Sequence, residues 1–293
     1  MDAKNGRKRE QVETLKENHK NNNNNKKRQQ VFPYGNYKSY YNYRIAEGVD
    51  EDPRLKVFKK EWFQGKDCLD IGCNSGIITI QIALKFNCRS ILGIDIDSDR
   101  VEDANWNLRK TDRLKSARNK PSKVSKLKDN SHTDHSENSA TVSSNVNTKE
   151  ISKEPSSLKQ IDLVNIVSFE RENFVHCRHP PGKHYDTILC LSVSKWIHLN
   201  WGDDGLITLF AETWKLLRPG GIFVLEPQPW KSYESNRNAS EITAANYRNI
   251  KFRPEEFQEI LLDKIGFRTV EAITSDLTGS TTGFNRPILI FQK

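Results

Sequence analysis

One short stretch decides the fold: Leu69-Asp70-Ile71-Gly72-Cys73-Asn74-Ser75-Gly76. It runs from a short apolar strand into a glycine turn, and the segment 77–86 that follows has helical apolar spacing. A second strand, 90–96, carries Asp95 at its end, about 20 residues after the turn. Glycine lets a ligand approach the backbone closely, and a carboxylate in that place can accept hydrogen bonds from two ribose hydroxyls. The stretch predicts a nucleoside-bearing cofactor in an α/β domain.

The spacing of the glycines distinguishes between two cofactors. A dinucleotide fingerprint is G-x-G-x-x-G, whereas this chain has Gly72-x-x-x-Gly76 with Asp70 ahead of the turn. An acid there would repel a pyrophosphate, but it suits a cationic ligand with an amino-acid tail. S-adenosylmethionine (SAM) carries a sulfonium and an ammonium group, so we predict SAM rather than NAD. A glycine turn without any ligand is the remaining alternative, and the matching Asp95 disfavours it.

Strand and helix patterns alternate along the rest of the chain. Strands with little polar alternation, separated by helices, predict a parallel sheet covered on both faces. The last two strands have no helix between them, so we expect an antiparallel hairpin at one edge, connected through Thr278–Gly283. The other expected strands are 68–71, 163–169, 185–193, 222–225, 267–275 and 287–292, and the other expected helices are 99–109, 203–217 and 254–265.

Composition divides the 293 residues into folded and unfolded parts. Residues 1–30 and 110–161 contain no aromatic side chain and are rich in Asn, Ser and Lys, so they cannot bury a core. We predict a disordered basic arm at 1–30 and one domain over 31–293, interrupted by a disordered insert at about 110–160. The arm and the insert carry a net charge of +5 each, which leaves −2 for the rest of the chain. Flexible basic segments suit a polyanionic partner, and a rigid DNA-coating face is not expected.

Several classes of protein are not expected. No apolar run approaches the ~20 residues of a membrane span, and no apolar segment follows the basic N-terminus as in a secretory signal. The five cysteines are odd in number and form no C-x-x-C pair, so we expect reduced thiols with neither disulfides nor a metal site. The short basic clusters Arg7-Lys8-Arg9 and Lys26-Lys27-Arg28 allow nuclear import, and we expect a nuclear protein.

A tyrosine-rich segment, Phe32–Arg44, holds five tyrosines in ten positions. Its Pro, Gly and Asn residues argue against regular helix or strand, so we expect an irregular aromatic lid on the domain. A tyrosine can pack its ring and still present its hydroxyl to a ligand.

From Lys66 to the C-terminus the pattern resembles the class I SAM-dependent methyltransferases, including the turn Leu217-Arg218-Pro219-Gly220-Gly221. This resemblance implies a Rossmann-like α/β fold with a seven-stranded, mostly parallel sheet, one late antiparallel strand, and helices on both faces. Longer segments look like the bicoid-interacting-protein family, and within it the chain is most similar to the 7SK RNA methylphosphate capping enzymes. Those segments are Tyr40-Tyr41-Asn42-Tyr43-Arg44, Pro53-Arg54-Leu55 ahead of Glu61-Trp62-Phe63, 189–203, 225–230 and Gly283-Phe284-Asn285-Arg286-Pro287.

The family resemblance implies transfer of the SAM methyl group to an oxygen of the 5′ γ-phosphate of a small nuclear RNA. The implied cofactor contacts are Tyr41, Arg54, Gly72, Cys73, Asn74, Asp95, Ile96, Asn173, Phe174 and Leu191. The implied catalytic residues are Lys195, Tyr40 and Tyr43, and the implied substrate contacts are Trp196, Glu226 and Phe284.

The chemistry agrees with these residue types. A terminal phosphate has a second pKa near ~6 and is already an anionic nucleophile at pH 7, so no general base is required. Catalysis is then mostly alignment and placement of charge. We expect Lys195, at the end of the fourth strand, to hold the phosphate with tyrosine hydroxyls rather than an arginine clamp. We expect His198 to make a structural hydrogen bond.

Two other functions remain open from the sequence. One is a methyltransferase for a 5′-monophosphate RNA end or a small anionic metabolite. The other is a non-catalytic RNA-binding scaffold that retains SAM. For the leading function we expect a monomer that binds the 5′ end of a small nuclear RNA, with neither DNA nor a membrane as partner.

Overall fold

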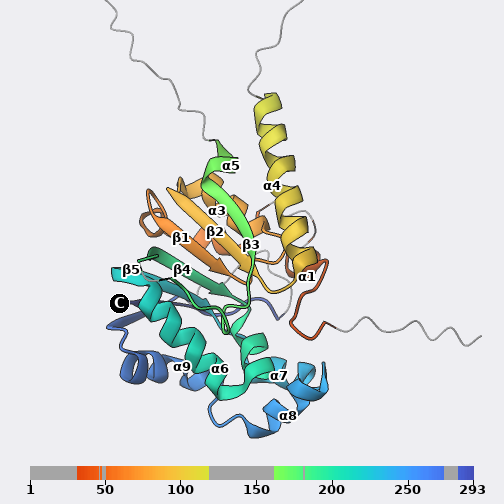
Figure 1. The fold of residues 1–293 in the computed structure, drawn as a ribbon, viewed down its shortest axis with the longest axis vertical. Helices are drawn as coiled ribbons and strands as arrows, with labels where there is room; N and C mark the ends of the chain where they lie inside the picture. Colours follow the sequence, from red (N-terminus) through yellow and green to blue (C-terminus); the bar gives the residue numbers. More distant parts are fainter. Residues whose placement is uncertain (1–31, 46, 48–50, 119–161, 181, 274–282) are drawn as a thin grey trace, which may run out of the picture. The chain divides into compact units, whose positions relative to one another are not determined.

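A seven-stranded sheet carries the fold, with the strand order β3-β2-β1-β4-β5-β7-β6 (Figure 1). β7 runs antiparallel to both of its neighbours, whereas the other pairs are parallel, as predicted. This arrangement is the class I methyltransferase sheet. The strands are β1 (Asp67–Ile71), β2 (Ser90–Asp95), β3 (Val167–Arg171), β4 (Tyr185–Leu191), β5 (Leu217–Glu226), β6 (Thr269–Ile273) and β7 (Ile288–Gln292).

The computed structural model describes residues 32–45, 47, 51–118, 162–180, 182–273 and 283–293. The predicted arm at 1–30 lies outside these residues, as do most of the predicted insert and of the β6–β7 connection. Among the residues described, no helix has the length and apolar character to span a membrane.

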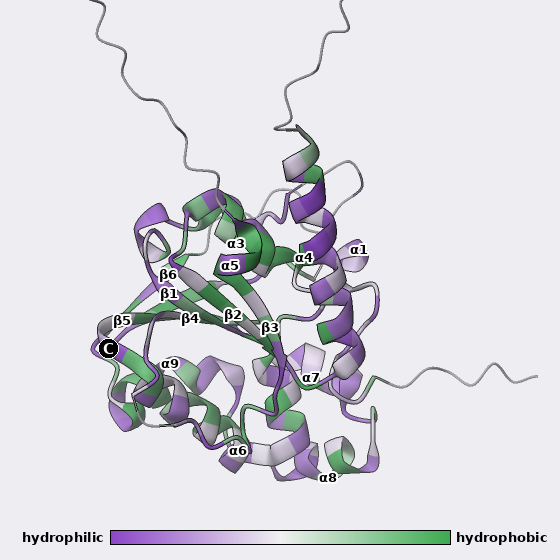
Figure 2. Ribbon diagram, turned by 45° about the horizontal axis from the view of Figure 1, so that its top comes forward, coloured by the Kyte–Doolittle hydropathy of each residue, from purple (hydrophilic) through white to green (hydrophobic). Residues whose placement is uncertain are grey.

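Helices cover both faces of the sheet (Figures 1 and 2). One face carries α3 (Ile77–Phe86), α4 (Ser98–Arg118) and α5 (Leu163–Ile166), and the other carries α6 (Ser194–Leu216) and α9 (Phe257–Glu259). α9 lies between a 3₁₀ turn, η2 (Pro254–Glu256), and a π-helical turn, η3 (Ile260–Ile265). The remaining helices are α1 (Tyr40–Arg44), α2 (Arg54–Val57), the 3₁₀ turn η1 (Lys60–Trp62), α7 (Trp230–Asn236) and α8 (Glu241–Asn249).

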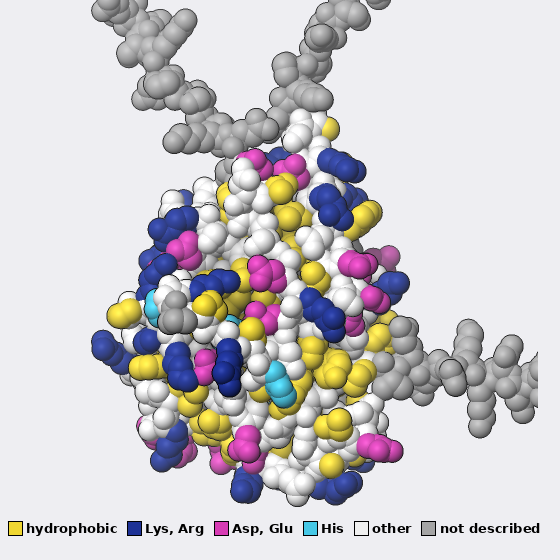
Figure 3. Space-filling view, viewed as in Figure 1, with side chains coloured by type: hydrophobic (Ala, Val, Ile, Leu, Met, Phe, Trp, Pro, Cys, Tyr) yellow, Lys and Arg dark blue, Asp and Glu magenta, His cyan; other side chains and the backbone are white. Residues whose placement is uncertain are grey.

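The core has two parts because side chains alternate across each strand. Along β4, Leu189 and Leu191 belong to the cluster beneath α3, whereas Ile188 and Cys190 belong to the cluster beneath α6. Each face of the sheet therefore buries its own apolar layer. Figure 3 shows basic, acidic and apolar side chains interspersed on one face of the surface, in keeping with the small charge that the sequence leaves for the folded part.

Several predicted elements have different bounds, and the helix predicted over 254–265 is divided into η2, α9 and η3. Residues 163–166, predicted to begin the third strand, form α5, because Asn165 bonds back to the backbone and carboxylate of Asp162. The helix predicted to end at residue 109 continues to Arg118, since no Gly or Pro stops it, so the first part of the predicted insert is helical. Residues 218–221, predicted as a turn, form a bulge within β5. Leu217 pairs with Tyr185 and Ile222 pairs with Thr187, so the register shifts across these residues.

Two further corrections concern the site. The last five residues of the tyrosine-rich segment form α1 and are not irregular, because burial of Tyr41 and Arg44 holds one helical turn against the domain. The helix predicted to begin at Asp203 begins at Ser194 and passes a kink at Gly202, where φ is 64°. Lys195 therefore lies in the first turn of α6 and not at the end of β4. α7 and α8 were not predicted, although Ser240 and Thr243 form a capping box at the start of α8.

Candidate active site

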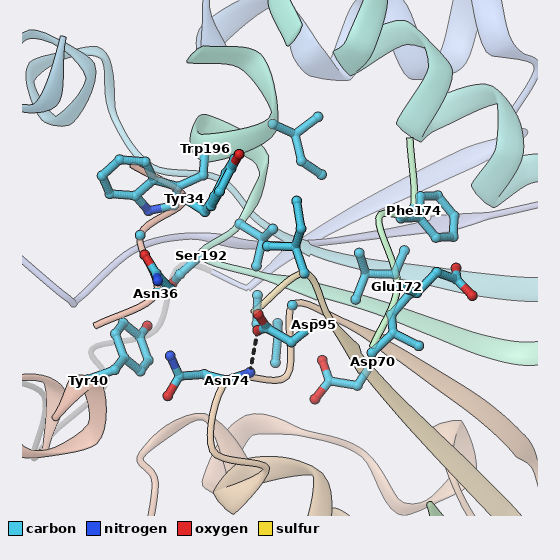
Figure 4. A pocket seen from close by; sticks show the side chains of 18 of the residues that line it. Tyr34, Asn36, Tyr40, Asp70, Asn74, Asp95, Glu172, Phe174, Ser192 and Trp196 are labelled. Atoms are coloured by element: carbon cyan, nitrogen blue, oxygen red, sulfur yellow. Dashed lines mark hydrogen bonds between the residues drawn. The ribbon is translucent and has the colours of Figure 1, made fainter. Parts of the chain in front are cut away.

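A cavity of about 860 Å³ lies at the carboxyl ends of β1, β2 and β4, where sheets of this kind bind ligands (Figure 4). In Figure 4, Asp70, Asn74 and Asp95 face it from the strand ends, Glu172 and Phe174 lie at another side, and Tyr34, Asn36 and Trp196 lie across from the strands. The predicted cofactor residues that line it are Tyr41, Arg54, Gly72, Asn74, Asp95, Ile96, Asn173, Phe174 and Leu191.

The turn after β1 has little room for side chains. Gly72 has a φ of 76°, and a Cβ there would lie 2.3 Å from Cγ2 of Val193. The backbone N–H groups of Gly72 and Cys73 donate to the carbonyl of Ile94 at 2.8 and 2.9 Å. Cys73, predicted as a cofactor contact, is buried and is not among the residues that line the cavity. Glycine at 72 is therefore required by the packing of Val193, and its backbone also lines the cavity.

Two buried carboxylates face the cavity. Asp95 accepts hydrogen bonds from the backbone N–H of Asn74 at 2.9 Å and of Asp97 at 3.0 Å, and burial raises its pKa. A carboxylate has about four acceptor sites, so it can also accept from two ribose hydroxyls. Asp70 accepts from the Thr79 hydroxyl at 2.6 Å, and burial raises its pKa to about 6.

A buried ion-pair cluster lies beside this cavity. Arg54 binds both carboxylate oxygens of Asp52, at 2.9 and 2.7 Å, and reaches Glu226 at 3.0 Å. Arg44 donates to the other oxygen of Glu226 at 2.8 Å. Although burial alone would raise the pKa of Glu226, Arg44 and Arg54 lower it. Glu226, predicted as a substrate contact, is fully buried in this cluster and is not among the residues that line either cavity.

A second cavity, of about 920 Å³, adjoins the first. It brings together five residues that the family resemblance assigns to the RNA end. Four residues line both cavities and form a shared wall between the two cavities. The five are Tyr40, Tyr43, Lys195, Trp196 and Phe284. The shared wall is formed by Gly35, Tyr40, Ser192 and Trp196. A Cβ on Gly35 would lie 2.0 Å from the Trp196 indole nitrogen, so the wall is tightly packed.

Two cations line the second cavity. The Lys195 ammonium donates to the Ser232 hydroxyl at 2.9 Å and to the Asn236 amide oxygen at 2.6 Å, and burial, followed by the charge of Arg286, lowers its pKa to about 7. The Arg286 guanidinium donates to the Ser192 hydroxyl at 3.1 Å and to the Gly283 carbonyl at 2.9 Å, and burial lowers its pKa. Among the lining residues that the structure describes, none is acidic.

Sequence reasoning gave no role to several residues here. Arg286 lies within the segment Gly283–Pro287, which resembles the family, and this resemblance could have identified it. No periodicity or spacing in the sequence indicates that its side chain lines the same cavity as Lys195. Asp52 and Arg44 are recognisable as a buried pair only after folding. His198 makes structural hydrogen bonds as predicted, to Asp203 at 2.8 Å and Tyr233 at 3.3 Å.

The strand order and the ligand cavity together define a class I SAM-dependent methyltransferase. Gly72, the buried Asp95 and the Tyr41 segment over the strand ends fit SAM, which supplies an electrophilic methyl group when bound.

Comparisons with known proteins define the family. The family model described as Bicoid-interacting protein 3 (Bin3) matches residues 185–293, and the model for ribosomal protein L11 methyltransferase (PrmA) matches residues 54–150. A probable RNA methyltransferase of Arabidopsis thaliana is 62% identical over 90% of this chain and 82% of its own length. The U6 snRNA methylphosphate capping enzyme of Drosophila melanogaster is 38% identical over 89% of this chain and 75% of its own length. The chain belongs to the Bin3 family, which confirms the resemblance.

The human relative is longer. The 7SK snRNA methylphosphate capping enzyme of Homo sapiens is 37% identical over 90% of this chain, and the match covers 40% of that enzyme. This chain therefore corresponds to less than half of the human enzyme.

Proposed function

We propose that this chain methylates the 5′ γ-phosphate of an RNA, with a small nuclear RNA as substrate and SAM as methyl donor. The observation that carries the proposal is a buried Lys195 and a half-buried Arg286 that line one cavity and whose hydrogen-bond acceptors among the described residues are all neutral. Buried charges in proteins are normally paired. An anionic ligand in the second cavity would supply the missing partner.

The balance of charge supports a terminal phosphate. In the neighbouring cluster, Arg44 and Arg54 are balanced by Asp52 and Glu226. A terminal phosphate carries about −1.5 to −2 at pH 7 and would favour the protonated form of Lys195, whose pKa is about 7 in this structure, so that Lys195 and Arg286 together supply two positive charges to balance it. The two cations approach from different segments, α6 and the residues before β7, so they can hold different oxygens of one phosphate or of neighbouring phosphates.

The two cavities suggest how the reactants meet. We assign the cofactor to the first cavity, held by Tyr41, Arg54, Asp95 and the backbone at Gly72, and the RNA end to the second. Transfer would take place across the shared wall, where Tyr40 and Trp196 line both cavities. The protein's contribution is alignment of the phosphate oxygen with the methyl carbon, together with placement of positive charge.

The relatives favour a triphosphate over a monophosphate end. Those named as snRNA methylphosphate capping enzymes match about 90% of this chain. Relatives named as 5′-monophosphate methyltransferases match 37% or 17% of it. The substrates in these names also support a nuclear location, as do the basic clusters at 7–9 and 26–28. We assign residues 31–293 to one methyltransferase domain, interrupted by the insert and preceded by the basic arm.

The test is incubation of the full chain with labelled SAM and one RNA sequence bearing a 5′-triphosphate, monophosphate or hydroxyl end. We expect label only on the triphosphate RNA. We also expect that label to be released when a pyrophosphatase removes the terminal phosphates. Label retained after that treatment would place the methyl group elsewhere on the RNA and refute the proposal. SAM binding without transfer to any RNA would favour a scaffold.

A further inference from the structure

Three side chains with metal-binding atoms meet in the loop after β3. Glu172, Cys177 and His179 each offer a ligand atom, and these atoms all lie within 4.8 Å of one another. A turn brings them together, because the backbone N–H groups of His176 and Cys177 both donate to the carbonyl of Asn173, at 3.0 and 2.9 Å. The sequence had not indicated this group, since its spacing matches no familiar zinc motif.

The group contains polar atoms that lack partners. The side chains of His179 and Glu172 are 10% and 19% exposed, and the ring of Phe174 lies 4.8 Å from that of His179. Oε1 of Glu172 and Nε2 of His179 are buried and have no hydrogen-bond partner within the described part of the chain. An unsatisfied buried polar atom costs about 1–3 kcal/mol. A cation bound to Oε1 of Glu172 would remove that cost at the carboxylate, and Nδ1 of His179, 3.8 Å from the same oxygen, is placed to be a second ligand.

We propose that Glu172, Cys177 and His179 form a binding site for a zinc-class divalent cation. Thiolate, imidazole and carboxylate together suit Zn²⁺, whereas Mg²⁺ and Ca²⁺ prefer oxygen ligands alone. Ligand atoms on a tetrahedral zinc lie roughly 3.3–3.6 Å apart, given its usual bond lengths. Nδ1 of His179 and Oε1 of Glu172 are 3.8 Å apart, and all three ligand atoms lie within 4.8 Å of one another, so side-chain shifts on the order of 1 Å would bring them to these separations. Binding releases the thiol proton of Cys177 to solvent and leaves a fourth position for water.

The site adjoins the cofactor cavity but does not depend on the proposed RNA substrate. Glu172, Asn173 and Phe174 line that cavity, and Phe174 also contacts His179. An ion held at 172, 177 and 179 would fix the loop that carries these lining residues. Zinc and SAM should therefore bind with positive coupling, whatever the methyl acceptor is.

The test is calorimetric titration of the metal-free full chain with zinc chloride, alongside Cys177→Ser, His179→Gln and the control His184→Gln from the same segment. We expect one zinc per chain, an affinity at least about tenfold weaker in the first two variants, and no change in the control. A tenfold weaker SAM affinity after chelation would show the coupling. Equal zinc affinity in all four proteins, or none in the wild type, would overturn the proposal.

A second measurement needs no variant. The structure describes all five cysteines. Those at 68, 73, 88 and 190 are buried, whereas Cys177 is partly exposed. Its alkylation can therefore be followed by mass spectrometry in the wild-type protein. Zinc chloride at stoichiometric concentration should slow alkylation of Cys177, and magnesium chloride should not. Alkylation at the same rate with zinc would count against the site even if Cys177→Ser failed to fold.

Discussion

Replacement of Lys195 by methionine tests the proposed phosphate site most directly. Methionine keeps the length and much of the apolar volume of the side chain while removing the charge. A lost hydrogen bond to a charged group costs about 1.5–3 kcal/mol, and one lost alignment contact can slow a reaction ~10²-fold. We therefore expect about a hundredfold slower methylation of triphosphorylated RNA at saturating SAM, with unchanged SAM affinity. Lys231→Met, on the exposed side of α7, is the matched control.

The same variant should not be less stable at neutral pH. The pKa of Lys195 falls from 10.5 to about 7 on folding, chiefly through burial, which corresponds to roughly 5 kcal/mol against the charged form. The unfolded chain thus binds more protons between about pH 7 and 10.5, and this group makes stability rise with pH over that window. The cost of burying the charged Lys195 ammonium is fully present below pH 7. Lys195→Met removes it and loses two hydrogen bonds to Ser232 and Asn236, which offset part of the gain.

The pH profile of kcat/KM for RNA gives the decisive result. The acidic limb should reflect the phosphate, whose second pKa is near ~6, and the alkaline limb should reflect loss of the Lys195 proton at about 7. We expect the alkaline limb to disappear in Lys195→Met. If the variant methylates at the wild-type rate, or keeps that limb, the assignment of Lys195 to the phosphate is wrong.

Four other predictions concern the two cavities and the insert. Asp95→Asn should weaken SAM binding at least about tenfold by calorimetry, because the carboxylate would bind the ribose hydroxyls, and it should also lower the melting temperature, because the amide nitrogen cannot accept from the backbone N–H of Asn74 or Asp97; unchanged affinity would remove Asp95 from the site. Arg286→Gln should raise KM for triphosphorylated RNA more than tenfold and leave SAM affinity intact, and equal losses of both would indicate a structural role instead. Tyr41→Phe should weaken SAM binding, whereas Tyr43→Phe should slow methyl transfer alone; the reverse pattern in calorimetry and rate assays would refute the division of the tyrosines between the two ligands. Deletion of residues 119–155 should preserve methylation of a short triphosphorylated RNA, and a melting temperature lower by several degrees would contradict the composition argument.

Local patterns sufficed for the central strands and the cofactor turn. The apolar runs in β1, β2 and β4 and the helical spacing of α3 have strong periodicities, and the position of Asp95 follows from the end of its strand. The bounds of α6 were wrong because Gly202 resembles a helix stop, although the chain passes it with one kinked residue. α1 was missed because burial of Tyr41 and Arg44 outweighs the local preference of Asn and Tyr residues for irregular backbone.

The charges of the site were beyond sequence reasoning for a different reason. Arg54 pairs with Asp52, two residues away in the sequence. Arg54 and Arg44 also each bind Glu226, which lies more than 170 residues further along the chain. No spacing rule indicates such a contact. The same holds for Lys195 and Arg286, which line one cavity although they lie on separate segments. We expected Lys195 and tyrosine hydroxyls alone to hold the phosphate, whereas Arg286 lines the same cavity.

Glu226 gives the two cavities a common support. Its oxygens bind Arg44, from the helix whose Tyr40 and Tyr43 line the second cavity, and Arg54, which lines the first. It also accepts from the Ser192 hydroxyl at 2.8 Å, and Ser192 belongs to the shared wall. A shift of this carboxylate would therefore disturb the cofactor side, the wall and α1 together. Because methyl transfer depends on alignment within a fraction of an ångström, a buried group that bonds to all three can govern the rate without touching either reactant.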